Sequence, residues 1–201
     1  MASVVDICNL ALSHLGDNAT LASIDPPEGS MQAEHCARFY PVARDSMLEL
    51  HDWKFATRRA PLAWLDRPSW NWQYAYAAPA QAIKFISVLP FSAGNDSETQ
   101  QYETEADENG NVIILTNQEQ ATMRFIARVI DTTRFPPLFV DALAWLLASH
   151  LAGPIIKGKE GTAEARTCYS TFRLICSQAM TSDANQRKVT PEHKVDWMAS
   201  R

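Results

Sequence analysis

Hydrophobic positions follow a helical spacing near both ends of the chain and an alternating spacing in its middle. In the first segment, residues 3–16, the apolar positions are Val4, Ile7, Cys8, Ala11, Leu12 and Leu15. Positions separated by three, four, seven and eight residues share one face of a helix. Ser3 is the expected N-cap, and Gly16 is the expected stop. The pattern predicts an amphipathic helix that buries one face.

A second helix is predicted from about Ser30 to Leu50, after the turn "IDPPEG". Ser30 and Glu34 are one residue away from capping-box spacing, so they form only a partial start signal. Pro41 lies inside this segment and lacks the N–H that a helix needs. We therefore expect the helix to kink or to split after Phe39 and Tyr40.

Between Trp53 and about Val129 the hydrophobic period changes toward two. Short runs rich in β-forming residues alternate with clusters of Pro, Gly, Asn and Asp: "FATRRAPLAW", "WQYAYAAP", "AIKFISVLP", "TQQYETEA", "NVIILT" and "TMRFIARV". These runs predict about six strands, enough for a small antiparallel sheet or sandwich. Asn109 and Gly110 separate two of the runs and predict a tight hairpin turn.

Two further helices are predicted near the C-terminal end. The segment "PPLFVDALAWLLASHLAG" begins behind Pro136 and Pro137, and Gly153 and Pro154 are expected to end it. It is apolar nearly all round, so its own domain or neighbouring subunits must cover it. The last helix is expected from about Thr162 to Ala184. Its apolar face contains Ala165, Cys168, Tyr169, Phe172, Ile175, Cys176 and Ala179.

These elements predict an α+β fold in which the N- and C-terminal helices form a bundle and an antiparallel β-rich region is inserted between them. The expected divisions are residues 1–52 for the N-terminal helices and 53–130 for the β-rich insertion. Residues 131–184 supply the C-terminal helices, and residues 185–201 form an extended tail.

Composition limits the class of protein further. The chain has 201 residues, 46% hydrophobic and 20% charged, which is typical of a folded globular protein. Its formal net charge of −5 argues against general affinity for nucleic acid. The cysteines Cys8, Cys36, Cys168 and Cys176 show no metal-type spacing and are expected to be reduced core residues. The longest apolar run contains Asp141 and His150, so we expect no membrane span.

No motif for a phosphate loop, a zinc protease or a serine hydrolase is present, and the five histidines are scattered. We therefore expect no enzyme, no cofactor and no metal. Acidic residues do cluster between Ser92 and Gln120, where Lys and Arg are absent: Asp96, Glu98, Glu103, Glu105, Asp107, Glu108 and Glu119. Two of these carboxylates could serve a glycosidase. A solvated strand beside a hairpin explains them better.

An aromatic cluster occupies the stretch from residue 52 to residue 79. It contains Trp53, Phe55, Trp64, Trp70, Trp72, Tyr74 and Tyr76, interleaved with Arg58, Arg59 and Arg67. Stacking rings and arginines could bind single-stranded nucleic acid or a sugar. A seam of aromatic side chains between the helices and the sheet is favoured, because the chain is acidic and the rings flank prolines at strand ends.

Several blocks of the sequence, in order, resemble the tail tubular protein A family, the head-to-tail adaptors of short-tailed bacteriophages. They are "ICNLALSHLGD", "AEHCARFYPVARDSMLELHDWKFATRRAPLA", "WQYAYAAP", "VIILTN", "RFIARVIDTTRFPPLFVDALAWLLASHLAGPI" and "DWMASR". The likeness extends from residue 7 to residue 201. No one block is as specific as a phosphate-binding loop, so the ordered series carries the resemblance.

The resemblance implies a structural virion protein, made in the bacterial cytoplasm, that forms a ring at the head–tail interface. Members commonly form twelve-subunit rings, bind the portal protein above and receive the tail nozzle protein below, while DNA passes through without sequence-specific binding. Some such adaptors are credited with cell-wall degradation. A peptidoglycan hydrolase and a single-strand nucleic-acid binder are therefore the alternatives.

Two sets of residues receive expected roles in such a ring. Glu103, Glu105, Asp107 and Glu108 are expected to line the channel, because negative walls repel phosphates and let DNA slide. The tail "PEHKVDWMASR" is polar apart from Val195, Trp197 and Met198. These three residues and Arg201 are expected to dock on the portal or on a neighbouring subunit, because burying an indole is favourable.

Overall fold

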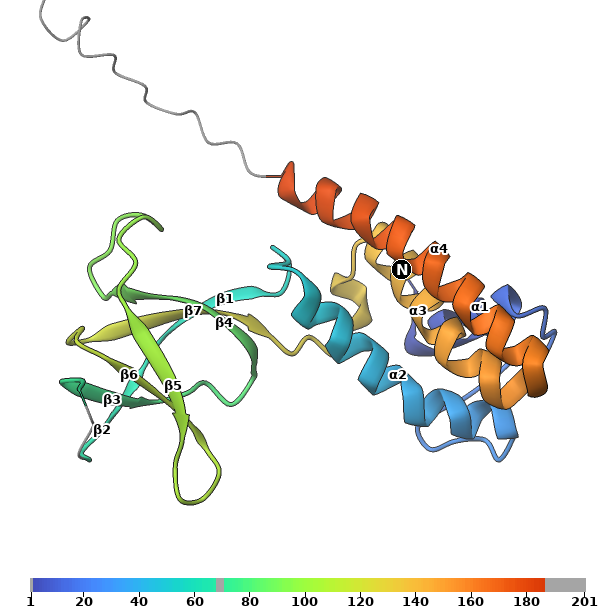
Figure 1. The fold of residues 1–201 in the computed structure, drawn as a ribbon, viewed down its shortest axis with the longest axis horizontal. Helices are drawn as coiled ribbons and strands as arrows, with labels where there is room; N and C mark the ends of the chain where they lie inside the picture. Colours follow the sequence, from blue (N-terminus) through green and yellow to red (C-terminus); the bar gives the residue numbers. More distant parts are fainter. Residues whose placement is uncertain (1, 68–70, 187–201) are drawn as a thin grey trace, which may run out of the picture.

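The computed structural model describes residues 2–67 and 71–186, which form two lobes (Figure 1). Helices from both ends of the chain build one lobe, and all the strands build the other. The fold is α+β, with terminal helices and a β-rich middle, as the sequence predicts. The expected tail, residues 185–201, lies outside the described residues apart from Asn185 and Gln186.

The first two helices follow their sequence signals closely. Helix α1 (Val4–His14) begins with a complete capping box, in which the Ser3 hydroxyl accepts from the Asp6 N–H and the Asp6 carboxylate accepts from the Ser3 N–H. Gly16, just beyond the helix, has the left-handed φ of +73° that glycine adopts without strain. Helix α2 (Met31–Leu50) runs unbroken past Pro41 and is capped by Ser30. The expected split after Tyr40 therefore does not occur.

The strands form two antiparallel sheets. One sheet has the order β1–β7–β4 and contains β1 (Thr57–Pro61), β7 (Ala121–Ala127) and β4 (Ala82–Pro90). The other has the order β2–β3–β6–β5 and contains β2 (Ala63–Leu65), β3 (Tyr74–Ala77), β6 (Val112–Thr116) and β5 (Tyr102–Ala106). Buried side chains from both sheets, including Tyr76, Ile114, Val88, Met123 and Phe125, share one core. The β lobe is thus a small sandwich.

The run from Phe55 to Trp64 was expected to be one strand and is divided between the two sheets. Thr57–Pro61 pairs with β7, and Ala63–Leu65 pairs with β3. Leu62 lies between the two strands and donates its N–H to the Ala121 carbonyl at 2.9 Å. Pro61 lacks an N–H for a ladder, which is consistent with its place at the end of β1.

The predicted hairpin at Asn109 and Gly110 is present and joins β5 to β6. Of the two residues, only Gly110 takes a positive φ, +79°. The Asp107 carboxylate accepts hydrogen bonds from the backbone N–H groups of Asn109 and Asn111, at 2.8 and 2.7 Å. The turn therefore depends on Asp107 as well as on the Asn-Gly pair.

Helices α3 (Pro137–Ile156) and α4 (Gly158–Ala184) are both longer than predicted. Gly153 and Pro154 do not end α3, which continues to Ile156. Lys157 and Gly158 make the turn, both with a φ of +63°, so α4 begins four residues before Thr162. The close return is possible because Gly161 has no side chain: a Cβ there would lie 2.9 Å from the Ala152 carbonyl oxygen.

Helix α3 is the centre of the helical lobe. It contacts α1, α2 and α4 of its own chain, and nine of its residues are buried. Its own domain therefore supplies the cover that its apolar surface requires, and a neighbouring subunit is not needed for it. Among the described residues, α3 is the one helix whose length and composition would suffice to cross a membrane, a test that the core helix of a folded domain also passes.

The four cysteines Cys8, Cys36, Cys168 and Cys176 are free and buried in the helical core, as predicted. Burial raises the pKa of the Cys176 thiol, because an apolar environment disfavours the thiolate. Burial is also the main cause that raises the pKa of Cys168, to about 11. Both thiols remain protonated and pack as small apolar side chains at neutral pH.

Candidate functional site

The acidic residues expected to line a channel lie together on the β5–β6 hairpin. Glu103 and Glu105 are exposed, lie on β5 and pair with Leu115 and Ile113 of β6, so both carboxylates belong to one face of the sheet. Glu108 is exposed in the turn. The hairpin therefore presents several carboxylates within a few residues of one another.

Two of the four hairpin carboxylates also have structural contacts. The Glu103 carboxylate accepts a hydrogen bond from the Trp72 indole N–H at 3.0 Å. Side-chain and backbone hydrogen bonds from Asn111 lower the pKa of Asp107, since they stabilise its charged form. Glu105 and Glu108 are thus the carboxylates of the hairpin that can be changed with the least effect on its fold.

The aromatic cluster is not one seam. Trp53 is 1% exposed and packs edge-on against Phe139 of α3, with ring centroids 5.0 Å apart. Phe55 contacts the same ring at 5.0 Å. Trp64, by contrast, is 63% exposed on β2, at the edge of the other lobe. The expected seam between helices and strands is confirmed only for Trp53 and Phe55.

The remaining aromatic side chains belong to the β lobe. Tyr76 is buried between the sheets, and its hydroxyl donates to the Gln118 carbonyl at 2.9 Å. Tyr74 is half-buried, with its ring centroid 6.4 Å from that of Tyr76. Together with Leu62, Trp64, Glu119 and Gln120 they line a hollow of about 360 Å³. Trp70 lies outside the described residues.

One arginine of the cluster, Arg59, is held by a carboxylate rather than by the aromatic rings. Arg59 lies 2.5 Å from the Asp96 carboxylate, which also lies 3.4 Å from Arg124 on β7. Asp96 therefore neutralises positive charge that would otherwise attract a phosphate. The hollow beside Trp64 carries Glu119 and no basic side chain. This arrangement disfavours single-strand binding.

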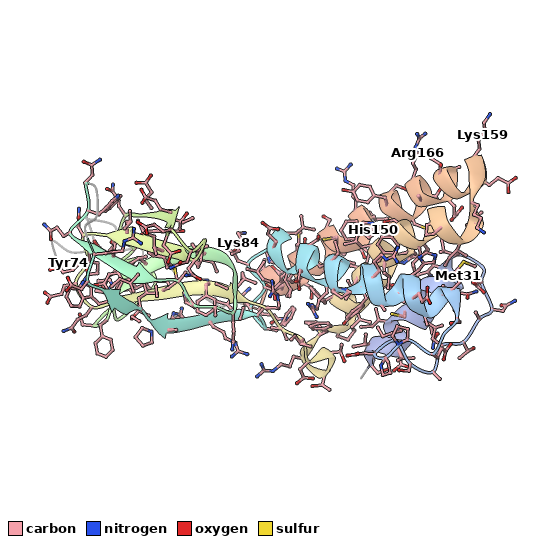
Figure 2. All side chains as sticks on the ribbon, turned by 90° about the horizontal axis from the view of Figure 1, so that it is seen from below. Met31, Tyr74, Lys84, His150, Lys159 and Arg166 are labelled. Carbon is pink, nitrogen blue, oxygen red and sulfur yellow. The ribbon has the colours of Figure 1, made fainter. Side chains whose placement is uncertain are left out.

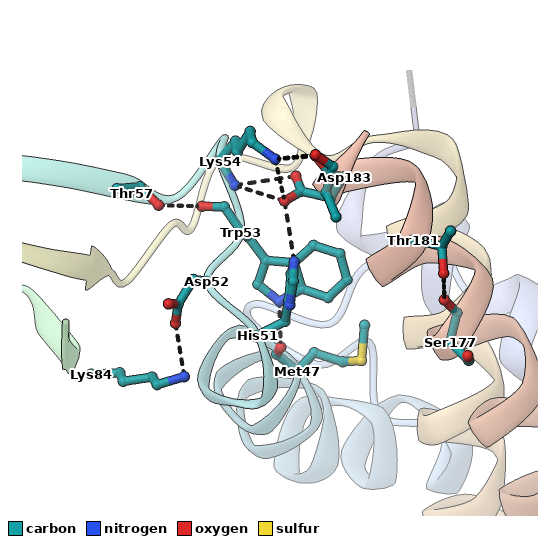
Figure 3. Close-up of polar contacts among 11 residues, drawn as sticks. Met47, His51, Asp52, Trp53, Lys54, Thr57, Lys84, Ser177, Thr181 and Asp183 are labelled. Carbon is teal, nitrogen blue, oxygen red and sulfur yellow. Dashed lines mark hydrogen bonds and ion pairs between the residues drawn. The ribbon is translucent and has the colours of Figure 1, made fainter. Parts of the chain in front are cut away.

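A buried carboxylate joins the last turn of α4 to the segment between α2 and β1 (Figure 3). The Asp183 side chain is 5% exposed and accepts from the Lys54 backbone N–H at 3.1 Å. The His51 Nε2 atom lies 3.2 Å from the same carboxylate. Beside it, the Trp53 indole donates to the Met47 carbonyl at 2.7 Å. These contacts fix the end of α4 against the junction of the two lobes.

The junction is further bridged by two ion pairs. Lys84 of β4 lies 2.8 Å from Asp52, and Arg128, just after β7, lies 3.1 Å from Asp45 of α2. Each pair connects the β lobe with the helical lobe. Exposed pairs contribute about 0–1 kcal/mol each, so their main effect is on the orientation of the lobes rather than on stability.

An open groove of about 760 Å³ lies between α3 and α4. Its lining contains Ser149, His150, Thr162, Ala165, Arg166, Tyr169, Ser170, Arg173, Leu174 and Ser177. The sequence pattern placed Tyr169 on the buried face of the last helix, but its side chain is 51% exposed. Tyr169 lies at the edge of that face, where α3 leaves it uncovered.

Described residues offer little for catalysis. They contain no group of three or more His, Cys, Asp or Glu side chains that could hold a metal ion. A glycosidase acid needs a raised pKa. Hydrogen bonds that stabilise the charge lower the pKa of Asp6, Glu28, Asp107 and Asp131. These are the properties of capping and turn residues.

Sequence patterns identified the acidic hairpin but missed the groove and the Asp183 contacts. Asp183 and Lys54 are 129 residues apart, and neither stands in a motif. The one available signal was the placement of Asp183 among the apolar positions of α4. The expected docking residues Val195, Trp197, Met198 and Arg201 lie outside the described residues.

Compared with models of known protein families and with curated protein sequences, the chain matches none.

Proposed function

We propose that the chain is a structural subunit of a bacteriophage head-to-tail adaptor, a ring that joins the portal protein to the tail nozzle protein. The proposal begins from the ordered sequence blocks that resemble the tail tubular protein A family. The described two-lobed shape supports it, because one lobe can build a ring while the other extends toward a further partner (Figure 1).

The observation that carries the proposal is the concentration of carboxylates on the β5–β6 hairpin. Glu105 and Glu108 are exposed, and no Lys or Arg occurs between Ser92 and Gln120. Such a surface repels DNA phosphates, and negative walls let a genome move through a channel without adhering. We propose that Glu103, Glu105, Asp107 and Glu108 face the axis of the ring.

The tail is proposed as the contact with the portal or with a neighbouring subunit. Fifteen residues, 187–201, follow the part of α4 that the structure describes. Asp183 anchors the last turn of that helix, so the tail starts from a defined point on the lobe. Val195, Trp197 and Met198 supply apolar surface, and Arg201 supplies charge.

Binding to the portal protein tests the proposal. The chain would be mixed with a portal protein from the same genome and examined by size-exclusion chromatography with light scattering. We expect a complex that contains several copies of the chain for each portal ring, commonly twelve. A chain that remains monomeric and separate from the portal would overturn the proposal.

The two alternatives have their own readouts. A peptidoglycan hydrolase would clear suspensions of cell walls, and changing one carboxylate to its amide would abolish that activity. A single-strand nucleic-acid binder would bind more weakly as salt increases. Neither is favoured by the exposed carboxylates of the hairpin or by the division of the aromatic cluster between the lobes.

A further inference from the structure

The groove between α3 and α4 has apolar side chains that water still reaches. Tyr169 is 51% exposed and Leu174 is 63% exposed. The charged side chains of its lining are Arg166 and Arg173, and neither forms an ion pair with any residue that the structure describes. Figure 2 shows Arg166 and Lys159 directed away from the body of the helical lobe. The groove is therefore apolar, basic and open to a partner.

A second copy of the same groove is a poor occupant. Two grooves face to face would bring four guanidinium groups together with no carboxylate between them. Like charges placed opposite one another at an interface repel and disfavour the contact. The partner surface must therefore be a different and acidic one, which makes the contact heterologous.

The opposite charge occurs around the connection between α1 and α2. Residues 1–37 contain no Lys or Arg. We call this surface the acidic end of the lobe. It consists of an exposed apolar side chain, Met31, and four carboxylates: Asp17, Asp25, Glu28 and Glu34. Met31 is 52% exposed, and the amide of Gln32 beside it donates to Asp17 at 3.2 Å. The acidic end, like the groove, has exposed apolar surface flanked by charged side chains. Its charges are negative, whereas those of the groove are positive.

We propose that the α3–α4 groove of one copy binds the acidic end of the next copy. This inference rests on the proposed ring and names its subunit contact. Arg166 and Arg173 lie opposite the carboxylates, and Leu174 and Tyr169 bury apolar surface against Met31. Because groove and acidic end are different surfaces, each copy uses both and the contact can repeat from copy to copy. It forms a closed ring when the rotation between neighbours completes a circle.

The charge pattern also fixes the direction of assembly. Groove against groove is repulsive, and so is acidic end against acidic end, so only one order of contact remains. Glu28 accepts from the Ala22 N–H at 2.8 Å and shapes the loop. Asp25 and Glu34 are exposed, and neither forms an ion pair with the described residues. These two carboxylates are therefore the ones to alter.

Cross-linking tests the contact in the full-length chain. Met31→Cys and Leu174→Cys variants would be mixed at high protein concentration with a short bismaleimide. The four native cysteines are buried and serve as no competing sites. We expect a covalent dimer from the mixture and little from either variant alone. Equal yields from the mixture and from the single variants would contradict the proposed pairing.

Charge reversal gives an independent readout. Arg166→Glu with Arg173→Glu is expected to weaken self-association at least about tenfold, measured by sedimentation, since two like-charge contacts replace two attractive ones. Adding Asp25→Arg and Glu34→Arg to the same chain should restore association. The matched control, Arg58→Glu with Arg67→Glu, changes two exposed arginines of the β lobe and should associate as the wild type does.

The outcomes separate this contact from the proposed function. A chain that assembles with the portal, yet whose Arg166→Glu and Arg173→Glu variant assembles normally, overturns the contact and leaves the adaptor standing. A chain that stays monomeric at high concentration and with the portal overturns both. Restored assembly in the fourfold charge-swapped chain supports this contact specifically.

Discussion

The carboxylate of Asp183 accepts a hydrogen bond from the backbone N–H of Lys54 at 3.1 Å, although the two residues are 129 positions apart in the chain. This contact ties the end of the last helix to the segment where the chain leaves the helical lobe for the β lobe. The Lys54 ammonium also donates to the Asp183 backbone carbonyl. The last turn of α4, from which the tail continues, is therefore held directly against the junction of the lobes.

Replacing Asp183 should destabilise the protein. The Asp183→Ala variant leaves the Lys54 N–H without its acceptor in a buried site, and hydrogen bonds to charged groups contribute about 1.5–3 kcal/mol. We expect a loss of about 2 kcal/mol in the free energy of unfolding, measured by urea denaturation. Asp66→Ala, at an exposed position, is the control and should change it by less than about 0.5 kcal/mol. Equal effects would refute the role of Asp183.

A pair of glycines tests the close approach of α3 and α4. In Gly161→Ala the new Cβ would lie 2.9 Å from the Ala152 carbonyl oxygen, so the helices must separate. Overpacking of this kind costs about 1–3 kcal/mol. Gly153→Ala meets nothing within 4 Å and removes a flexible residue from a helix, so stability should be unchanged or slightly higher. Thermal unfolding of the two variants measures the difference.

Histidine burial predicts a loss of stability at mildly acidic pH. The His14 ring stacks on Trp145 with centroids 3.8 Å apart, and burial lowers its pKa from the ordinary value of 6.5. Burial also lowers the pKa of His150. The unfolded chain then takes up protons at a pH where the folded chain does not. The free energy of unfolding is therefore highest above about pH 6.5 and falls as the pH drops through and below it.

The variant that checks this pH dependence is His14→Phe, which keeps a ring beside Trp145 but cannot titrate. Its free energy of unfolding should fall less between pH 7 and pH 5 than that of the wild type. Asp6 and Asp107, whose carboxyl pKa values are lowered, affect the free energy of unfolding in a different pH range. Their stabilising contributions are lost only as the pH falls below about 3.8. Parallel curves for variant and wild type would exclude His14 as the cause.

Reversing charge on the hairpin should make the channel retain DNA. Glu105→Lys with Glu108→Lys leaves the Trp72–Glu103 hydrogen bond and the Asp107 turn intact. We expect assembled rings of this variant to bind DNA with an affinity that decreases steeply with salt. Rings carrying Asp66→Lys and Glu160→Lys have the same net charge and should bind less. A fluorescence titration at several salt concentrations distinguishes them.

Truncation after Asn185 isolates the contribution of the tail. The shortened chain retains Asp183, so its thermal unfolding should match that of the full chain. We expect it to lose binding to the portal, as should Trp197→Ala. Normal portal binding by the truncated chain would show that the last residues carry no partner contact.

Much of the helical lobe could be predicted from local sequence signals. Ser3, Asp6 and Gly16 define α1 through capping and a left-handed turn, which act over a few residues. The predicted end of α3 was wrong because Pro154 lies inside the last turn of the helix, which continues for two residues beyond Pro154. The predicted start of α4 was wrong because the turn places both Lys157 and Gly158 at positive φ. A lysine rarely adopts that conformation, so the sequence pattern did not indicate so short a turn.

Long-range pairing was the part that local patterns could not supply. Nothing within "FATRRAPLAW" indicates that β1 pairs with β7 while β2 pairs with β3. In the same way, Trp53 and Trp64 belong to one aromatic cluster of the sequence, yet they are 1% and 63% exposed. Their burial depends on which lobe each segment enters, and that is decided by partners far along the chain.

Electron microscopy of the chain bound to the portal protein tests the central claim most directly. We expect a closed ring of copies beneath the portal, with Glu105 and Glu108 of the β5–β6 hairpin facing the axis. A hairpin on the outer rim would contradict the channel assignment. Absence of the chain from the portal vertex would contradict the adaptor function itself.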